Sequence, residues 1–328
     1  MSDTALRNPV VSVGNLSMGG RGKTPIVALI ARILLEAGER PAILSRGYGR
    51  RVHEDGVVVV SDGEHLLADI DRSGDEPLML ARGVPGAAVF VCDQRALAGA
   101  LAERHFRATV HVLDDGFQHR ALARDVDIVV VAPEDLSDRP LPFGRLREPV
   151  SALGSADAVV FDDGQAPDPG NRGAGSVLND LPSSVRRFSL RRSMGDVRPL
   201  ESHRPWLAPD RGPVVALAGI ARPDRFFRGL RDRGWQVARE ISFRDHHAYT
   251  AEDIARLASD VVAFSATGVL TTEKDAERLL PWRPFPVRVG AVPLAVAIEP
   301  HEIDVAAGFR PPAAFRSWLL ERIHEARA

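Results

Sequence analysis

The sequence predicts an α/β fold with a doubly wound, mostly parallel sheet and a second, smaller α/β domain. Short β-branched runs alternate with helical patterns through the first half of the chain, at the spacing of strand–helix–strand units. A stretch rich in Gly, Pro, Asp and Ser without periodicity follows at about 163–185, and a second strand–turn–helix pattern begins near residue 212. The length of 328 residues exceeds one typical core and suits two domains.

The domain boundaries follow from these shifts in composition. We expect a first domain over 1–162, a linker or irregular connection over 163–211 and a second α/β domain over 212–328. The amphipathic pattern at 312–327 predicts a terminal helix that packs back on the protein's own core. The alternative role for its apolar side is membrane docking.

The order of the elements explains where a site should lie. Apolar runs that predict strands in the first domain cover 9–15, 41–45, 56–62, 87–91, 109–115 and 126–132. Helical patterns cover 24–39, about 75–83 and 93–106. The second domain continues through 212–235, 236–243, a helix that opens at Thr250, 268–275 and 287–299. Because such sheets bind ligands at the carboxyl ends of their strands, we expect the functional residues there.

Composition excludes several classes of protein. A net charge of −2 provides no global basic field, so we expect no nucleic-acid partner. The single Cys92 excludes an intrachain disulfide and a multi-cysteine metal site. The start lacks the pattern of a signal peptide, and no apolar run reaches the roughly 18 residues of a membrane-spanning helix. We therefore expect a cytosolic or peripheral protein.

The stretch "SVGNLSMGGRGKTPIV" at 12–27 lies between an apolar strand and a strong helix. It ends like a phosphate-binding loop of the form G-x-x-x-x-G-K-[ST], except that Ser17 stands where that pattern has its first glycine. Successive N–H groups before a helix form an anion cradle, with Lys23 reaching the outer phosphates and Thr24 placing its hydroxyl on Mg²⁺. The alternative is a turn that is rich in glycine only for packing. The residues predicted to bind nucleotide are Ser17, Met18, Gly19, Gly20, Arg21, Gly22, Lys23 and Thr24.

The segment "TVHVLDDGFQH" at 109–119 is the natural partner of this loop. An apolar strand that ends in an acidic residue is the Walker-B pattern, whose carboxylate holds Mg²⁺. Asp114 and Asp115 are adjacent, so they point to opposite faces of a strand and cannot do the same job. We expect one to serve the metal and the other a basic group or helix end. The alternative is an ordinary strand-end turn.

Two further segments contain titratable side chains that suit proton transfer. Asp75 and Glu76 precede a helix, where they either cap it or act as a base toward an acceptor hydroxyl. The segment "SFRDHHAYTAED" at 242–253 contains adjacent histidines, and His246 paired with a carboxylate would shuttle its proton. Those histidines are otherwise structural or simply exposed. A zinc site is disfavoured, because adjacent histidines seldom converge on one metal.

Arginine-rich loops at strand ends are candidates for binding an acidic substrate. "LPFGRLREP" at 141–149 contains Arg147 and Glu148, and "SRGYGR" at 45–50 contains Tyr48 between two arginines. Such arginines neutralise phosphate charge or are simply solvated. The segment "TTEKDAERL" at 271–279 resembles a guanine-reading loop, but its Lys and Asp are adjacent, so the spacing fails. This departure argues against a switch GTPase.

Taken together, these segments resemble the tetraacyldisaccharide 4′-kinase family of lipid A biosynthesis. The resemblance rests on an ordered series: "VGNLSMGGRGKTP", "SRGYGR", "GDEPLMLA", "DQR", "LDDGFQH", "LPFGRLREP", "ALAGIARPDRFF", "FRDHHAYT" and "TTEKDA". It implies a P-loop NTPase-like fold, with the kinase core in the first domain. It also makes Ser17 a family trait, because the family has serine or threonine there.

The resemblance implies a kinase that moves the γ-phosphate of ATP to the 4′-hydroxyl of an acylated disaccharide 1-phosphate, with Mg²⁺. Carried over by position, Lys23 and Thr24 hold phosphate and Mg²⁺, and Asp114 and Asp115 form the Walker-B pair. Asp75 looks like the catalytic base, with His246 as its partner from the second domain. Further family positions near phosphate or substrate are Tyr48, Arg95, Gln118, His119, Arg147 and Glu148.

The resemblance also implies a peripheral protein at the cytoplasmic face of the inner membrane, with no obligate protein partner. Family members begin with an apolar segment that docks on the membrane, whereas this chain starts almost at its first strand. We therefore expect docking to depend on other elements, or the natural start to lie upstream. Two alternatives stand beside this reading: a P-loop NTPase that acts as a regulatory or metal-delivery switch, and a kinase homologue that has lost activity.

Overall fold

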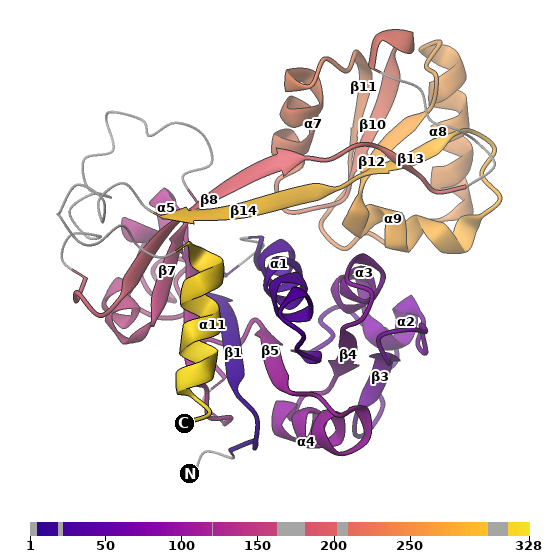
Figure 1. Cartoon of the computed structure of the whole chain (residues 1–328). Helices are drawn as coiled ribbons and strands as arrows, with labels where there is room; N and C mark the ends of the chain where they lie inside the picture. Colours follow the sequence, from indigo (N-terminus) through magenta and orange to yellow (C-terminus); the bar gives the residue numbers. More distant parts are fainter. Residues whose placement is uncertain (1–4, 19–21, 120, 163–180, 202–208, 301–313) are drawn as a thin grey trace.

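Two β-sheets organise the chain (Figure 1). The computed structural model describes residues 5–18, 22–119, 121–162, 181–201, 209–300 and 314–328. In spatial order, the larger sheet contains β14 (Leu294–Pro300), β8 (Arg186–Met194), β7 (Ala158–Phe161), β6 (Val126–Val131), β1 (Val10–Asn15), β5 (Val110–Asp114), β2 (Pro41–Ser45), β4 (Ala88–Val91) and β3 (Val58–Ser61). The strands from β8 to β4 in this order run parallel, and β14 and β3 pair antiparallel at the two edges.

Helices cover both faces of the larger sheet. One face carries α1 (Lys23–Glu36), α3 (Asp75–Gly83) and α11 (Phe315–Glu325), and the other carries α4 (Arg95–Phe106) and the 3-10 turn Val150–Ser155. The short helices α2 (Ile70–Ser73) and α5 (Pro133–Leu136) follow β3 and β6. This is the doubly wound, mostly parallel arrangement that the alternating pattern predicts, so the predicted fold class is confirmed.

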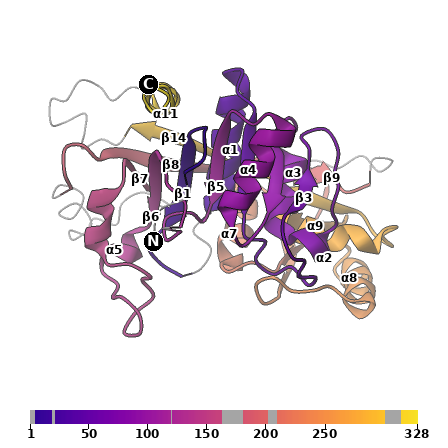
Figure 2. The ribbon, with the colours of Figure 1, turned by 90° about the horizontal axis from the view of Figure 1, so that it is seen from below.

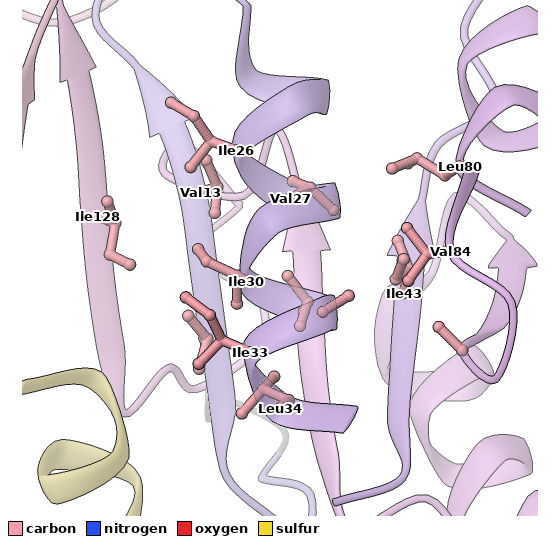
Figure 3. Close-up of a cluster of buried hydrophobic side chains, with 14 of the residues drawn as sticks. Val13, Ile26, Val27, Ile30, Ile33, Leu34, Ile43, Leu80, Val84 and Ile128 are labelled. Carbon is pink, nitrogen blue, oxygen red and sulfur yellow. The ribbon is translucent and has the colours of Figure 1, made fainter. Parts of the chain in front are cut away.

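Packing of α1 fixes the position of the phosphate-loop segment. Ile26, Ile30 and Leu34 recur on one side of the helix and are fully buried against the sheet (Figure 3). They pack against β-branched residues on one face of the sheet, which include Val13 of β1 and Ile43 of β2. Because a buried aliphatic side chain contributes about 1.5–3 kcal/mol, this face holds the first turn of α1 at the carboxyl end of β1.

The smaller sheet forms the second domain. Its order is β11 (Val237–Ser242), β10 (Val214–Ala218), β12 (Val269–Thr272), β13 (Val289–Val292) and β9 (Arg198–Pro199). The first four strands run parallel and β9 pairs antiparallel with β13. In the part of the chain that the structure describes, the helices beside it are α7 (Pro223–Asp232), α8 (Ala251–Ala263) and α9 (Glu273–Leu279). The run 268–275 therefore divides into a strand and the first turn of α9, because Thr272 caps a new helix through Asp275 N–H.

The connection between the domains differs from the predicted boundaries. The expected linker 163–211 contains β8, which is a strand of the larger sheet, and β9. The run 287–299 is two strands in different sheets, since β13 belongs to the small sheet and β14 pairs with β8. Figure 1 shows β8 and β14 as a two-stranded ribbon that reaches from the larger sheet toward the small domain. The side chains of residues 294–300 alternate between half-buried and exposed. Such alternation is typical of a strand, but it does not determine which sheet the strand joins.

The terminal helix α11 packs on the larger domain. Phe315, Trp318, Leu319 and Ile323 are buried in the same cluster as the core of α1 and its sheet. Figures 1 and 2 both place α11 beside β14. The range 212–328 thus contributes β14 and α11 to the first domain rather than forming one separate body. Among the described residues, no helix is long and apolar enough to cross a membrane.

Candidate active site

The loop between β1 and α1 has the features of an anion cradle. Ser17 is fully buried and bridges to Leu146, and the Met18 N–H donates to the carbonyl of Arg145 at 2.8 Å. Gly22 precedes α1 with φ +71°, and no side chain of the described residues caps the helix start. Free N–H groups at a helix N-terminus favour a phosphate. Gly19, Gly20 and Arg21 were also predicted to bind nucleotide and lie outside the described residues.

Lys23 and Arg147 meet at the end of β1. The Asn15 amide oxygen accepts from Lys23 Nζ at 2.8 Å and from Arg147 Nη2 at 2.6 Å. Lys23 Nζ also lies 3.2 Å from Asp115 Oδ1. Asn15 in turn donates to the carbonyl of Ser17 at 2.7 Å, so one amide links the loop to both cations. Sequence reasoning missed Asn15, although its signal was a polar residue ending a buried strand immediately before the loop.

The two adjacent aspartates have different environments. Arg147 donates to both Asp115 oxygens, at 3.0 Å and 2.9 Å. Burial raises the pKa of Asp115, but the hydrogen bonds from Arg147 and the charge of Lys23 outweigh it and hold that pKa well below its usual range. Asp114 ends β5, is 4% exposed, and has its pKa raised to about 7, first by burial and then by the negative charge of Glu76. Asp115 thus pairs with two cations, whereas Asp114 makes no ion pair with the described residues, and the assignment of one aspartate to the metal stays a prediction.

The residues predicted to hold Mg²⁺ fit that ion. The Asp114 carboxylate and the Thr24 hydroxyl are hard oxygen donors, which Mg²⁺ prefers, and Thr24 is buried in the first turn of α1. A cation would relieve the unfavourable proximity of Asp114 to the charge of Glu76. Among the described residues there is no group of three or more His, Cys, Asp or Glu side chains that could hold a metal by themselves, so such a site would need phosphate or water ligands too. The prediction of Asp115 as a metal ligand stays a prediction.

Asp75 and His246 meet across the two domains. Gly74 immediately precedes α3 with φ +84°, and a Cβ there would lie 2.8 Å from the carbonyl of Tyr48, so the residue before this helix must be glycine. Asp75 is the first residue of α3 and is 4% exposed. Its Oδ2 lies 3.0 Å from His246 Nδ1, although 171 positions separate the two residues in the sequence. Burial raises the pKa of Asp75, but the hydrogen bond with His246 and the charges of Lys274 and Arg278 bring that pKa below its usual value.

The loop between β11 and α8 presents the His246 ring. His246 has φ +58°, an uncommon conformation for a residue with a side chain, and its N–H donates to Asp245 Oδ1 at 3.0 Å. The exposed Tyr48 ring packs edge-on against it, with centroids 5.2 Å apart. The neighbouring His247 instead pairs with Asp253 at 3.0 Å. Of the two adjacent histidines, only His246 thus faces Asp75.

The remaining predicted residues lie near the carboxyl ends of β4 and β5. Arg95 is 1% exposed, and its Nη1 lies 3.3 Å from His119 Nδ1. Burial and the charges of Arg95 and Arg46 lower the pKa of His119 to about 4. Gln118 donates to the carbonyl of Asn15 at 2.8 Å. Glu148 follows Arg147 in the same loop and is half-buried. The structure therefore gathers these positions around the loop, while their roles toward phosphate or substrate stay predictions.

Sequence reasoning also missed an arginine beside the loop. Arg192 extends from β8 and pairs with the buried Asp162 at 2.8 Å and 3.0 Å. A Cβ at Gly22 would lie 2.6 Å from Arg192 Nη2, so the ribbon and the loop are in contact. The sequence gives no signal for this arrangement, because "RRFSLRRSM" at 186–194 contains several equivalent arginines.

An ion pair between α3 and α9 predicts how the stability of the fold depends on pH. Arg82 donates to Glu277 at 2.9 Å, yet burial raises the pKa of Glu277 from 4.5 to about 7. A carboxyl whose pKa is raised on folding stabilises the fold fully below its unfolded pKa, and this contribution is lost as pH rises through the folded pKa. We therefore expect Glu277→Gln to match the parent near pH 4.5 and to become the more stable of the two as pH rises through about 7. Urea unfolding of both proteins across this range is the measurement, and a constant difference would contradict the prediction.

Comparisons with known proteins show the family to which the chain belongs. A family model described as tetraacyldisaccharide-1-P 4′-kinase matches residues 1–307. The tetraacyldisaccharide 4′-kinase of Geobacter metallireducens is 40% identical over 311 residues, which cover 92% of this chain and 88% of that protein. Its counterpart in Nitrobacter winogradskyi is 39% identical over 332 residues, covering 100% and 90%.

A solved structure is also similar over most of its length. The "apo" form of LpxK from Aquifex aeolicus in complex with ATP superposes with a TM-score of 0.75 at 29% identity, covering 98% of this chain and 91% of that chain. The resemblance drawn from the motif series is thereby confirmed. The family model, the curated relatives and the similar solved structure together show that this chain belongs to the tetraacyldisaccharide-1-P 4′-kinase family.

Proposed function

We propose that this enzyme transfers the γ-phosphoryl group of ATP to the 4′-hydroxyl of an acylated disaccharide 1-phosphate. The observation that carries the proposal is the contact between Asp75 and His246, 3.0 Å apart and supplied by different domains. The charge of Glu76, the residue after Asp75, acts on Asp114 at the end of β5, which supports a position of this pair near the phosphate loop. A base placed beside a phosphate cradle is what transfer to a hydroxyl requires.

The chemical step can be derived from these side chains. Asp75, whose pKa lies below its usual value, is ionised near neutral pH and accepts the proton of the sugar hydroxyl. The hydroxyl oxygen then bonds to the γ-phosphorus, the bond from that phosphorus to the bridging oxygen breaks, and ADP leaves with its electron pair. Lys23 and the N–H groups at the start of α1 stabilise the charge on the phosphoryl oxygens. Thr24 and Asp114 would hold Mg²⁺, which supplies neutralisation of phosphate charge when bound.

The arginine loop supports the same assignment. Arg147 is held by Asp115 and Asn15, so its guanidinium is positioned before any substrate arrives, and a planar guanidinium suits phosphate. We assign Arg147, Arg95 and Tyr48 to the phosphate or sugar side of the site, with Gln118, His119 and Glu148 as supporting residues. This preorganisation would lower the cost of orienting two charged reactants.

We also place the enzyme peripherally at the cytoplasmic face of the inner membrane, where an acylated substrate would be found. Phe143 and Leu141 are 84% and 50% exposed, on a loop whose Arg145 carbonyl accepts from Met18 of the phosphate loop. Apolar side chains beside the site would contact lipid. Sedimentation with anionic phospholipid vesicles tests this, and failure of the protein to pellet with them would contradict it.

The decisive experiment uses γ-labelled ATP and purified disaccharide 1-phosphate lipid. We expect label in the lipid, dependent on Mg²⁺ and absent when the acceptor is omitted. Mass spectrometry of the product should show one added phosphate on the sugar distal to the existing one. Label that appears only as free phosphate would contradict the kinase and favour an NTPase that acts as a switch.

A further inference from the structure

We propose that Lys274 is a positioning residue that holds His246 as a neutral ring with its single hydrogen on Nδ1, so that the ring donates to Asp75. The chemical meaning of this inference rests on the proposed function, in which Asp75 is the base. The geometry that carries it does not depend on that function. Lys274 lies in "TTEKDA", the segment whose resemblance to a guanine-reading loop failed, and nothing in the transfer step above uses it.

Lys274 makes three contacts that account for the three hydrogens of its ammonium group. Nζ lies 3.0 Å from His246 Nε2, 3.1 Å from Glu76 Oε1 and 3.4 Å from Asp245 Oδ1. Its side chain is only 16% exposed. The acceptors come from α3 and from the loop before α8, while Lys274 itself is on α9. One side chain therefore links His246 and its loop to Glu76, the residue next to Asp75.

These contacts fix the position of the ring hydrogen. An ammonium group can only donate, so Nε2 must accept, and a neutral imidazole has one accepting and one donating nitrogen. The hydrogen then lies on Nδ1, which faces Asp75 Oδ2 at 3.0 Å. The opposite tautomer would turn an N–H toward the ammonium and a lone pair toward the carboxylate. A doubly protonated ring would also turn an N–H toward the ammonium, so only one form satisfies every contact.

The charges around the ring support this assignment. Burial would lower the pKa of Lys274, but the charges of Glu76, Asp75 and Asp245 raise it above its usual value, so the amine stays a donor. The titratable or charged groups that face the dyad from the surrounding elements are Asp75 and Glu76 of α3, Tyr48 after β2, Asp245 before α8, and Lys274 and Arg278 of α9. Without Lys274, the carboxylate of Asp245, whose Oδ1 lies 3.9 Å from His246 Nε2, would be the charged group next to that nitrogen.

The scarcity of lysine in the chain also draws attention to Lys274. Of 42 Lys and Arg residues, only Lys23 and Lys274 are lysines, and both lie in the site. An arginine has a planar fork of donors, whereas an ammonium is compact and its three donors diverge. Three acceptors on three sides suit the ammonium. This chain thus keeps lysine where a planar guanidinium would not fit.

The test is Lys274→Met in the full chain, observed by NMR of ¹⁵N-labelled histidine. The His246 signals are assigned with His246→Gln, and long-range ¹⁵N–¹H correlations distinguish the two tautomers from the doubly protonated ring. In the parent near neutral pH we expect a neutral ring with hydrogen on Nδ1. In Lys274→Met we expect a doubly protonated ring at the same pH. A ring that stays neutral with hydrogen on Nδ1 would overturn the proposal.

The control separates this role from domain contact. Arg82→Met breaks another ion pair between α3 and α9 without touching the ring, and should leave the His246 spectrum and turnover as in the parent. Lys274→Met should lower kcat roughly 10–100-fold, a part of the effect of a general base, move the acid limb of the kcat profile to higher pH, and leave KM for ATP unchanged. Equal losses in Lys274→Met and Arg82→Met would instead show a structural role.

Two further outcomes keep the inference separate from the proposed function. Should Lys274→Met not fold, Lys274→Gln keeps an NH₂ donor group without the charge and should move the ring in the same direction by a smaller amount. A parent that phosphorylates no lipid but shows the expected ring states would contradict the proposed function and support this inference. Normal lipid phosphorylation by a parent whose His246 ring carries its hydrogen on Nε2 would support the proposed function and contradict this inference.

Discussion

Asp75→Asn should lower kcat for lipid phosphorylation by roughly 10²–10⁴-fold, the range for loss of a positioned general base. The amide keeps the size of the carboxylate but cannot accept the sugar proton. Among the described residues, the Asp75 carboxylate contacts the Glu76 N–H, His246 and Arg278, and it makes no hydrogen bond to the phosphate loop. We therefore expect the Kd for ATP to change only slightly. Single-turnover transfer from γ-labelled ATP and calorimetric ATP binding are the two measurements.

The matched control is Asp71→Asn. Asp71 lies four positions earlier, on α2, and pairs with Arg51 at the surface, so its replacement should not affect turnover. Transfer by Asp75→Asn within tenfold of the parent would show that another group accepts the proton. His246→Gln should cost less than Asp75→Asn, because the ring acts through the carboxylate. In the double variant the loss should equal that of Asp75→Asn alone, as for residues that act as one unit.

Lys23→Met should lower kcat by roughly 10²–10³-fold, the size of effect seen when one charge-stabilising donor is removed from a preorganised site. Its Nζ is held by Asn15 and Asp115 at 2.8 Å and 3.2 Å, within reach of a phosphate at the start of α1. Unlike Asp75→Asn, this variant should also bind ATP more weakly, because in the proposed mechanism the lysine contacts the phosphates before transfer. The two variants can therefore be distinguished: Lys23→Met should change both the Kd for ATP and kcat, whereas Asp75→Asn should change mainly kcat.

Two controls accompany Lys23→Met. Arg32→Met removes a cation from an exposed position of the same helix, where Arg32 donates to the carbonyl of Gly83, and should leave ATP binding and turnover unchanged. Lys23→Arg restores the charge but not the compact ammonium, and we expect it to stay well below the parent. Full recovery in Lys23→Arg would contradict the idea that geometry, rather than charge alone, selects lysine here. Unfolding by urea should confirm that all three variants fold.

The sequence predicts the elements better than their assembly. The strand–loop–helix unit at 9–36 could be predicted because each part depends on neighbours in sequence: a buried β-branched strand, glycines and an amphipathic helix. By contrast, β14 and β13 form one apolar run in the sequence and belong to different sheets. Hydrophobic pattern specifies that a strand is buried, but partner choice depends on which edge is free once the rest has folded.

The same distinction holds within the site. From local motifs alone one could predict the candidate phosphate loop, the acidic end of β5 and the candidates Asp75 and His246, because the chemistry of each lies in a short segment. The contact between Asp75 and His246, the pairing of Asp115 with Arg147 and the contact of Lys274 with His246 Nε2 become visible only in the folded chain. Contacts between residues more than a hundred positions apart depend on how the two domains pack. The spacing of residues in the sequence does not predict such contacts. For this reason "TTEKDA" fails as a guanine-reading motif and nevertheless contains Lys274, which contacts His246.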